Sequence, residues 1–139
     1  MGLGSWFRRW MDGTTIAGCQ MDLKRVTKLC QAIEYRNQFA SNFIAAIKDF
    51  RAEEMSSPTL PRIDIEGLRA GAMKMKQTAK AISFGSEVVE EALSMTGNWL
   101  MLAALQHHTD PTIREDATRL LDQYFNFARG LLPAPSHQS

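Results

Sequence analysis

Apolar side chains recur at steps of three and four residues in four stretches of this chain, and glycine, proline and serine residues separate the stretches. This spacing is that of one face of an α-helix, which turns once every 3.6 residues. No stretch alternates polar residues with Val, Ile or Thr, as a half-buried strand would. The sequence therefore predicts an all-α fold, a four-helix antiparallel bundle or a close variant of one.

The first predicted helix runs from about residue 22 to residue 55. Asp22 is its expected N-cap, because Gly13, two threonines and Gly18 interrupt the chain before it. Asn37 falls within or beside the apolar stripe, so we expect it to be a buried structural residue; contact with a ligand is the alternative. The stripe itself consists of Leu23, Val26, Cys30, Ile33, Ala40, Ile44 and Ile47.

Capping residues mark the starts of the other three helices. After a loop at residues 56–61, Asp64 and Ser86 are the expected N-caps of the second and third helices. Asp110 followed by Pro111 is the clearest start signal, because a proline at the first helical position gives up no hydrogen bond. The third helix is apolar on every side over Trp99–Leu105, which places it at the core centre or in a subunit interface.

Length and composition fit one domain. The chain has 139 residues, of which 45% are hydrophobic and 22% charged, and this is ordinary for a globular protein. We expect an N-terminal amphipathic segment at residues 1–20, a single helical domain at 21–130 and a flexible C-terminal tail at 131–139. Residues 1–20 lack the continuous apolar run of a secretory signal, so the expected location is cytoplasmic.

The N-terminal segment combines aromatic and basic side chains. Trp6, Phe7 and Trp10 are apolar, while Arg8 and Arg9 are basic. Such a segment can lie in a membrane interface or bind a partner. It can equally fold back over the end of the helical domain, which is the interpretation that its short length favours.

A basic stripe is predicted on the second helix. Arg62, Arg69, Lys76 and Lys80 fall within a narrow sector of the helical wheel. Residues 62–85 carry five basic and two acidic side chains, and residues 86–139 carry three basic and seven acidic ones. The stripe can therefore pair with the acidic helices of the same chain, or it can follow the phosphate backbone of a nucleic acid.

A few residues around this stripe resemble a known class of protein. Leu60-Pro61, Gly67-Leu68, Ala72 and Lys76 resemble positions in the small helical subunits of CRISPR effector complexes. The resemblance implies an accessory subunit that lines a nucleic-acid path without catalysing a reaction. It covers a small part of the chain and does not include the N-terminal aromatic segment.

No pattern predicts catalysis or metal binding. His107 and His108 are adjacent, so they diverge on a helix and do not form a zinc-binding pair with Asp110. Cys19 and Cys30 lack the spacing of a redox or zinc motif, and we expect them to be reduced. Phosphate-binding glycine loops are absent from the sequence. We therefore expect a non-enzymatic protein without a cofactor.

These observations predict a helical interaction protein that docks to itself or to a larger protein assembly. Eight methionines and the aromatic N-terminal segment provide adaptable apolar surface for such a contact. Two alternatives remain open. One is an accessory subunit that binds a nucleic-acid backbone, and the other is a peripheral membrane protein anchored by its N-terminal segment.

Overall fold

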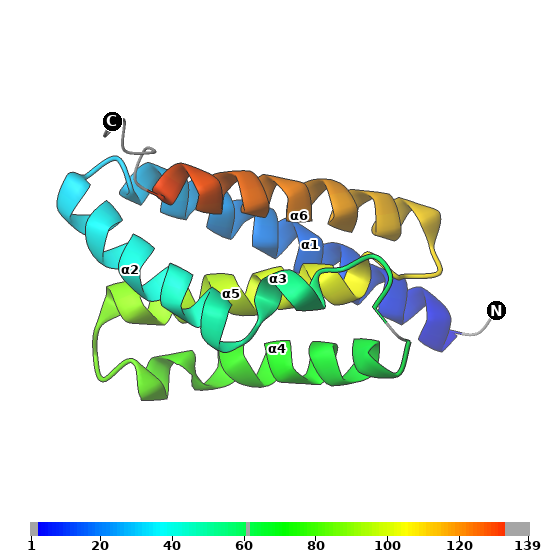
Figure 1. The fold of residues 1–139 in the computed structure, drawn as a ribbon. Coiled ribbons are helices and arrows are strands. Elements are labelled where there is room, and N and C mark those ends of the chain that lie inside the picture. The colour runs from blue at the N-terminus through cyan, green and yellow to red at the C-terminus, as the bar shows by residue number, and fades with distance from the viewer. Residues whose placement is uncertain (1–2, 61, 133–139) are drawn as a thin grey trace.

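The computed structural model describes residues 3–60 and 62–132, and it is all-helical over these ranges. Within these ranges, six α-helices follow one another (Figure 1). The predicted four-helix bundle is therefore not confirmed in that form. The helices are α1 (Leu3–Leu29), α2 (Ile33–Asp49), α3 (Ala52–Met55), α4 (Arg62–Ile82), α5 (Glu87–Leu105) and α6 (Pro111–Leu131).

Helix α5 forms the centre of the core. It contacts each of the other five helices, and every residue from Met95 to Leu105 is buried. Exposing any side of such an apolar helix to water would be unfavourable. Here the neighbouring helices of the same chain cover every side of it. The expectation that Trp99–Leu105 lies at the core centre is confirmed without a subunit interface.

The prediction of one continuous helix over residues 22–55 is wrong. The chain turns at residues 30–32, where Ala32 is extended, and again at Arg51, which adopts a left-handed conformation with φ of 51°. A straight helix of that length would extend about 50 Å, whereas α5 is about 28 Å long. The two turns let the apolar stripe fold back onto α5. They also leave Asn37 exposed on α2, so it is not the buried structural residue that was expected.

The predicted break before Asp22 is also wrong. Helix α1 continues through Gly13 and Gly18, so Asp22 lies inside the helix and the boundary expected at residue 20 has no structural counterpart. The side chains of Thr14 and Thr15 donate hydrogen bonds to carbonyl oxygens one turn earlier in the helix, at 2.9 and 3.0 Å. Burial of one face of α1 outweighs the low helix propensity of the glycines, which is about 1 kcal/mol each.

Two of the predicted caps are confirmed. Ser86 accepts a hydrogen bond from the backbone N–H of Val89, and Asp110 accepts bonds from the N–H groups of the first turn of α6. Asp64 instead lies in the first turn of α4, because that helix begins at Arg62. Helix α6 extends to a buried Leu131, within the stretch expected to be tail, and the tail residues 133–139 lie outside the described ranges.

Helices α4 and α5 lie close together at Gly97. A Cβ atom there would lie 2.6 Å from Cγ of Lys76 and 3.2 Å from the carbonyl oxygen of Ala72. Any larger residue would have to displace the Lys76 side chain and press against the backbone of α4. The expectation that Gly97 permits a tight helix crossing is confirmed.

Next to this crossing, Asn98 connects four helices through its side chain. Its Oδ1 accepts a bond of 2.5 Å from Nζ of Lys76 on α4, and its Nδ2 donates to Asp22 of α1 at 2.8 Å and to Tyr124 of α6 at 3.2 Å. The Tyr124 hydroxyl in turn donates to the carbonyl oxygen of Cys19 at 2.6 Å. All of these groups are satisfied, so the network fixes how α1, α4 and α6 sit around α5.

Candidate docking surfaces

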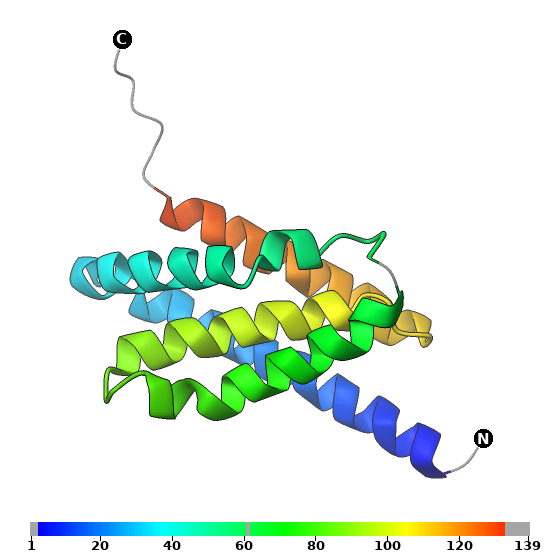
Figure 2. The ribbon, with the colours of Figure 1, turned by 60° about the horizontal axis from the view of Figure 1, so that its bottom comes forward.

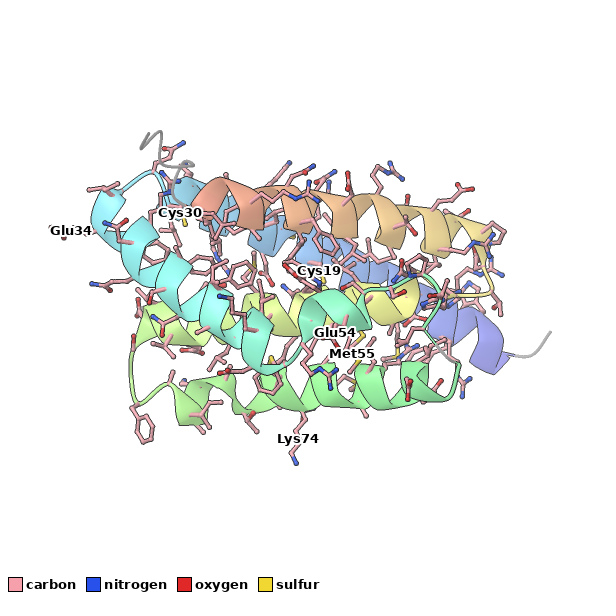
Figure 3. All side chains as sticks on the ribbon, in the orientation of Figure 1. Cys19, Cys30, Glu34, Glu54, Met55 and Lys74 are labelled. Carbon is pink, nitrogen blue, oxygen red and sulfur yellow. The ribbon has the colours of Figure 1, made fainter. Side chains whose placement is uncertain are left out.

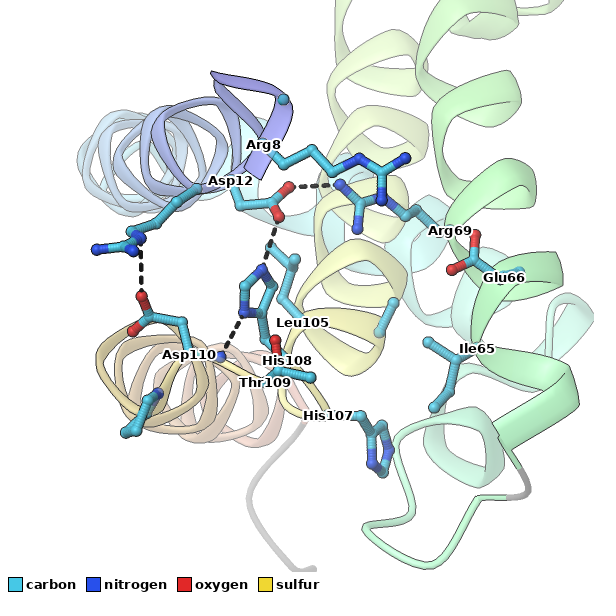
Figure 4. A pocket seen from close by; sticks show the side chains of 14 residues that line it. Arg8, Asp12, Ile65, Glu66, Arg69, Leu105, His107, His108, Thr109 and Asp110 are labelled. Carbon is cyan, nitrogen blue, oxygen red and sulfur yellow. Dashed lines mark hydrogen bonds and ion pairs between the residues drawn. The ribbon is translucent and has the colours of Figure 1, made fainter. Parts of the chain in front are cut away.

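The N-terminal half of α1 is held to the rest of the molecule by one buried carboxylate. Asp12 is 3% exposed. Its two oxygens contact Arg69 of α4 at 2.5 Å and Nε2 of His108 at 2.9 Å (Figure 4). Arg9 pairs with Asp110 at 3.1 Å beside this cluster. Helix α4 and the connection between α5 and α6 therefore both bind α1 here and determine which of its faces points outward.

Both ring nitrogens of His108 are occupied in this cluster. Nδ1 accepts the backbone N–H of Asp110 at 2.9 Å, so Nε2 is the nitrogen that carries a proton toward Asp12. A general base needs a free nitrogen lone pair close to its substrate. The pair of Asp12 and His108 therefore positions segments of the fold, and it offers no base to the cavity of about 880 Å³ beside it.

The opposite side of α1 carries four exposed apolar side chains, which we call the aromatic face. Trp6, Phe7, Trp10 and Met11 are 62, 52, 56 and 47% exposed. The rings of Phe7 and Trp10 are stacked, with their centroids 6.0 Å apart. The aromatic face is centred on the side of α1 opposite Asp12, and its four residues lie between about 100° and 160° from Asp12 around the helix. Figure 2 shows that this half of α1 projects beyond the other helices.

The rest of the exposed surface of α1 is neutral or basic. Its only two acidic residues, Asp12 and Asp22, are engaged in bonds to Arg69, His108, Asn98 and Arg25. Arg8 and Arg9 flank the aromatic face. They line the cavity in Figure 4, where the guanidinium group of Arg8 lies beside that of Arg69. The five residues singled out in the N-terminal sequence thus separate into an outward aromatic face and two flanking cations.

The predicted basic stripe is partly used inside the fold. Arg69 is bound to Asp12, and Lys76 is bound to Asn98. Lys80 is exposed, and the side chain of Arg62 lies outside the described part of the structure. The described contacts of Arg69 and Lys76 are those of structural residues that attach α4 to α1 and α5. An uninterrupted cationic track along α4 is not formed by these two side chains.

A second apolar surface lies between α4 and the α2–α3 segment, and we call it the apolar groove. It has a volume of about 640 Å³. Ser56 accepts a hydrogen bond from Nε1 of Trp99 at 2.6 Å and its carbonyl oxygen accepts one from Gln106, so the α3 side of the groove is fixed to α5. The apolar residues that line the groove are Phe50, Met55, Leu68, Met75, Ile82 and Leu100.

Two glycines of α4 also line this groove. A Cβ atom placed on Gly67 or on Gly71 would have no neighbour within 4 Å. The groove residues share no local sequence pattern, because they come from four segments that only the tertiary packing brings together. Figure 3 shows Met55 and Glu54 of α3 facing α4, while Lys74 projects away from the groove.

The two cysteines are poor nucleophiles. Burial raises the pKa of Cys19 from 9.0 to about 12, and it also raises the pKa of the half-buried Cys30. A thiol reacts as the thiolate, which is scarce at neutral pH when the pKa is this high. Within residues 3–60 and 62–132, no cluster of three or more His, Cys, Asp or Glu side chains could hold a metal ion.

Comparison of the chain with family models, with curated proteins and with solved structures found no significant match. In the part of the chain that the structure describes, no helix is long and apolar enough to cross a membrane. The aromatic face and the apolar groove are the two candidate docking surfaces of the molecule.

Proposed function

We propose that this protein is a non-enzymatic docking module whose binding surface is the aromatic face of α1. The observation that carries the proposal is the outward orientation of Trp6, Phe7 and Trp10 on a helix whose other face is anchored by Asp12. Tryptophan is the residue type most often found at the energetic centre of protein interfaces. Contiguous apolar side chains on a rigid element, rimmed by arginines, have the composition of such a centre.

The contacts within the polar cluster also support a non-enzymatic role. The Asp12 carboxylate is bound to Arg69, and Nδ1 of His108 accepts the backbone N–H of Asp110. The thiols are poor nucleophiles. A nucleic-acid path along α4 has weaker support than docking, because Arg69 and Lys76 already have partners within the chain. The aromatic face has no such internal partner to satisfy it.

The test is photo-crosslinking in the cells that make the protein. Replacing Phe7 with p-benzoylphenylalanine puts a photoreactive ring on the aromatic face, and the same residue at the exposed Gln77 of α4 is the control. A discrete adduct from position 7 and none from position 77 is the expected result. Absence of any adduct at position 7, or equal adducts at both positions, would contradict the proposal.

A further inference from the structure

We infer that the partner of the aromatic face is the surface of a lipid bilayer that contains anionic phospholipids, and that α1 lies along this surface. The inference rests on the proposed docking function and names the chemistry of its partner. Helices that lie in a membrane interface place tryptophan, phenylalanine and other large apolar side chains at the level of the headgroups, beside lysines or arginines. The outward side of α1 has this composition.

The aromatic face continues into two lysines along one side of α1. At 100° per residue, five side chains fall within a sector about 60° wide, and they extend over about 33 Å of the helix. They are Trp6, Trp10, Met21, Lys24 and Lys28. All five are exposed, and Met21 is 70% exposed. A straight row of exposed side chains on a rigid helix can contact a flat surface along its whole length.

The charge on this side of α1 is positive. Within residues 3–60 and 62–132, no ion pair involves Lys24 or Lys28. The two acidic residues of α1, Asp12 and Asp22, are bound to partners inside the molecule. The charge left on the outward side is therefore that of the two lysines, and a lysine close to a bilayer is attracted by anionic headgroups.

The neighbouring segments add little negative charge to the flanks of this surface. In the cavity beside the aromatic face, Asp12 and Asp110 are both in ion pairs. Glu66 lies on the far side of Arg69 from α1 (Figure 4). On the α6 side of α1, Asp116 forms an ion pair within its own helix. These carboxylates therefore offer little repulsion to an anionic surface that approaches α1 from outside.

The shape and size of the aromatic face favour a fluid surface over a folded partner. Its side chains stand on the end of α1 that projects beyond the other helices (Figure 2), so they form a protrusion rather than a cavity. Each of the four is about half exposed, and together they can bury about 400 Å², whereas each side of a specific protein interface buries about 800 Å². Lipids rearrange around inserted rings and need no matching pocket. Insertion of the rings and attraction of the lysines then act together, as two signals that hold a peripheral protein at a membrane.

The test measures binding of the full chain to unilamellar vesicles of phosphatidylcholine, with and without phosphatidylserine, by flotation at low and at physiological salt. Two variants each remove one part of the surface, and none of the replaced side chains is buried. The variants are Trp6→Ser with Trp10→Ser, and Lys24→Gln with Lys28→Gln.

Two control variants make the same kinds of change elsewhere on the molecule. Phe50→Ser with Phe84→Ser removes two exposed aromatic rings, one after α2 and one between α4 and α5. Lys48→Gln with Lys74→Gln removes two exposed lysines of α2 and α4. Circular dichroism checks that all four variants keep the helical content of the wild type.

The wild type and both controls should bind vesicles with phosphatidylserine more tightly than neutral ones, and more weakly as salt rises. The variant without Trp6 and Trp10 should lose binding to both kinds of vesicle. Replacing Lys24 and Lys28 should weaken binding to anionic vesicles about 30-fold, since each lysine near such a surface contributes about fivefold. Binding of this lysine variant to neutral vesicles should equal that of the wild type.

Tryptophan fluorescence gives a second measurement on the unmodified protein. Trp99, the third tryptophan of the chain, is fully buried, so lipids brominated in their acyl chains should quench only Trp6 and Trp10. Quenching in the bound wild type is the expected result. A bound protein without quenching would show that another surface holds it to the vesicle.

Three other results would overturn the inference. They are a wild type that does not bind anionic vesicles at low salt, binding that survives without Trp6 and Trp10, and losses in the controls as large as those in the surface variants. A wild type that ignores vesicles but gives a discrete protein adduct at position 7 would leave the docking function standing with a protein partner. An adduct at position 7 with the added mass of a phospholipid would support both proposals, and neither adduct nor vesicle binding would contradict both.

Discussion

Replacing Asn98 with leucine should destabilise the protein strongly, although both side chains branch at Cγ and have the same number of non-hydrogen atoms. Asn98 is fully buried and makes hydrogen bonds to Lys76, Asp22 and Tyr124. Bonds to charged partners contribute about 1.5–3 kcal/mol each and a neutral bond contributes about 1 kcal/mol. Lys76 and Asp22 regain water when the bond is lost, which reduces the total. We expect the free energy of unfolding to fall by about 3–4 kcal/mol.

Urea unfolding followed by circular dichroism measures this change, and it is large against a typical domain stability of about 5–15 kcal/mol. The matched control is Asn37→Leu, the same substitution at an exposed position on α2, which should change stability by less than about 0.5 kcal/mol. Tyr124→Phe removes one member of the network, so the double variant with Asn98→Leu should lose less than the sum of the single losses. A value for Asn98→Leu within about 0.5 kcal/mol of the wild type would refute the assignment of Asn98 as the residue that connects four helices.

Three further predictions follow from the crossing of α4 and α5, the cap of α6 and the buried thiol. Gly97→Ala should lose about 1–2 kcal/mol in urea unfolding, because the clash with Lys76 and Ala72 exceeds the gain in helix propensity; Gly71→Ala, in open space, should instead gain up to about 1 kcal/mol. Asp110→Ala removes the cap of α6 and should cost about 1 kcal/mol, seen as a melting temperature about 4 °C lower; no change in that temperature would contradict the capping role. Burial raises the pKa of Cys19 from 9.0 to about 12, so the unfolded chain loses this proton first, and this thiol should lower stability between about pH 9 and pH 12 by up to about 1.4 kcal/mol per pH unit, in addition to the loss from Tyr35 and Tyr124, whose pKa values burial also raises. Urea midpoints at pH 7–11 check the last prediction, and an unchanged slope in Cys19→Ala would count against burial of the thiol as its cause.

Local signals in the sequence were sufficient for the later helices. Ser86 and Asp110 are followed by residues whose N–H groups need an acceptor, so their capping role depends only on the next three positions. The complete burial of Trp99–Leu105 follows from an apolar run that leaves no polar face. Neither inference needs knowledge of a distant residue.

The breaks in the first half of the chain depend on distant packing. The turn at residues 30–32 contains neither glycine nor proline, and the glycines at positions 13 and 18 do not interrupt α1. The burial of Asp12 depends on Arg69 and His108, which lie 57 and 96 residues further along the chain. Local propensity carries no information on such partners, so the sequence showed the aromatic residues but not the surface on which they lie.

The enclosure of α5 by its neighbours also determines how mutations would be tolerated along the chain. In α1 and α6, positions that accept polar residues should recur with the period of the helix, because only one face is buried. From Met95 to Leu105 this periodic pattern of tolerated positions should be absent, since every side of α5 faces another helix. A saturation library selected for folded protein would therefore show an unbroken block of intolerant positions there. Sequence change in this fold would then be confined to the outer surfaces of the surrounding helices, where new contacts can arise without disturbing the core.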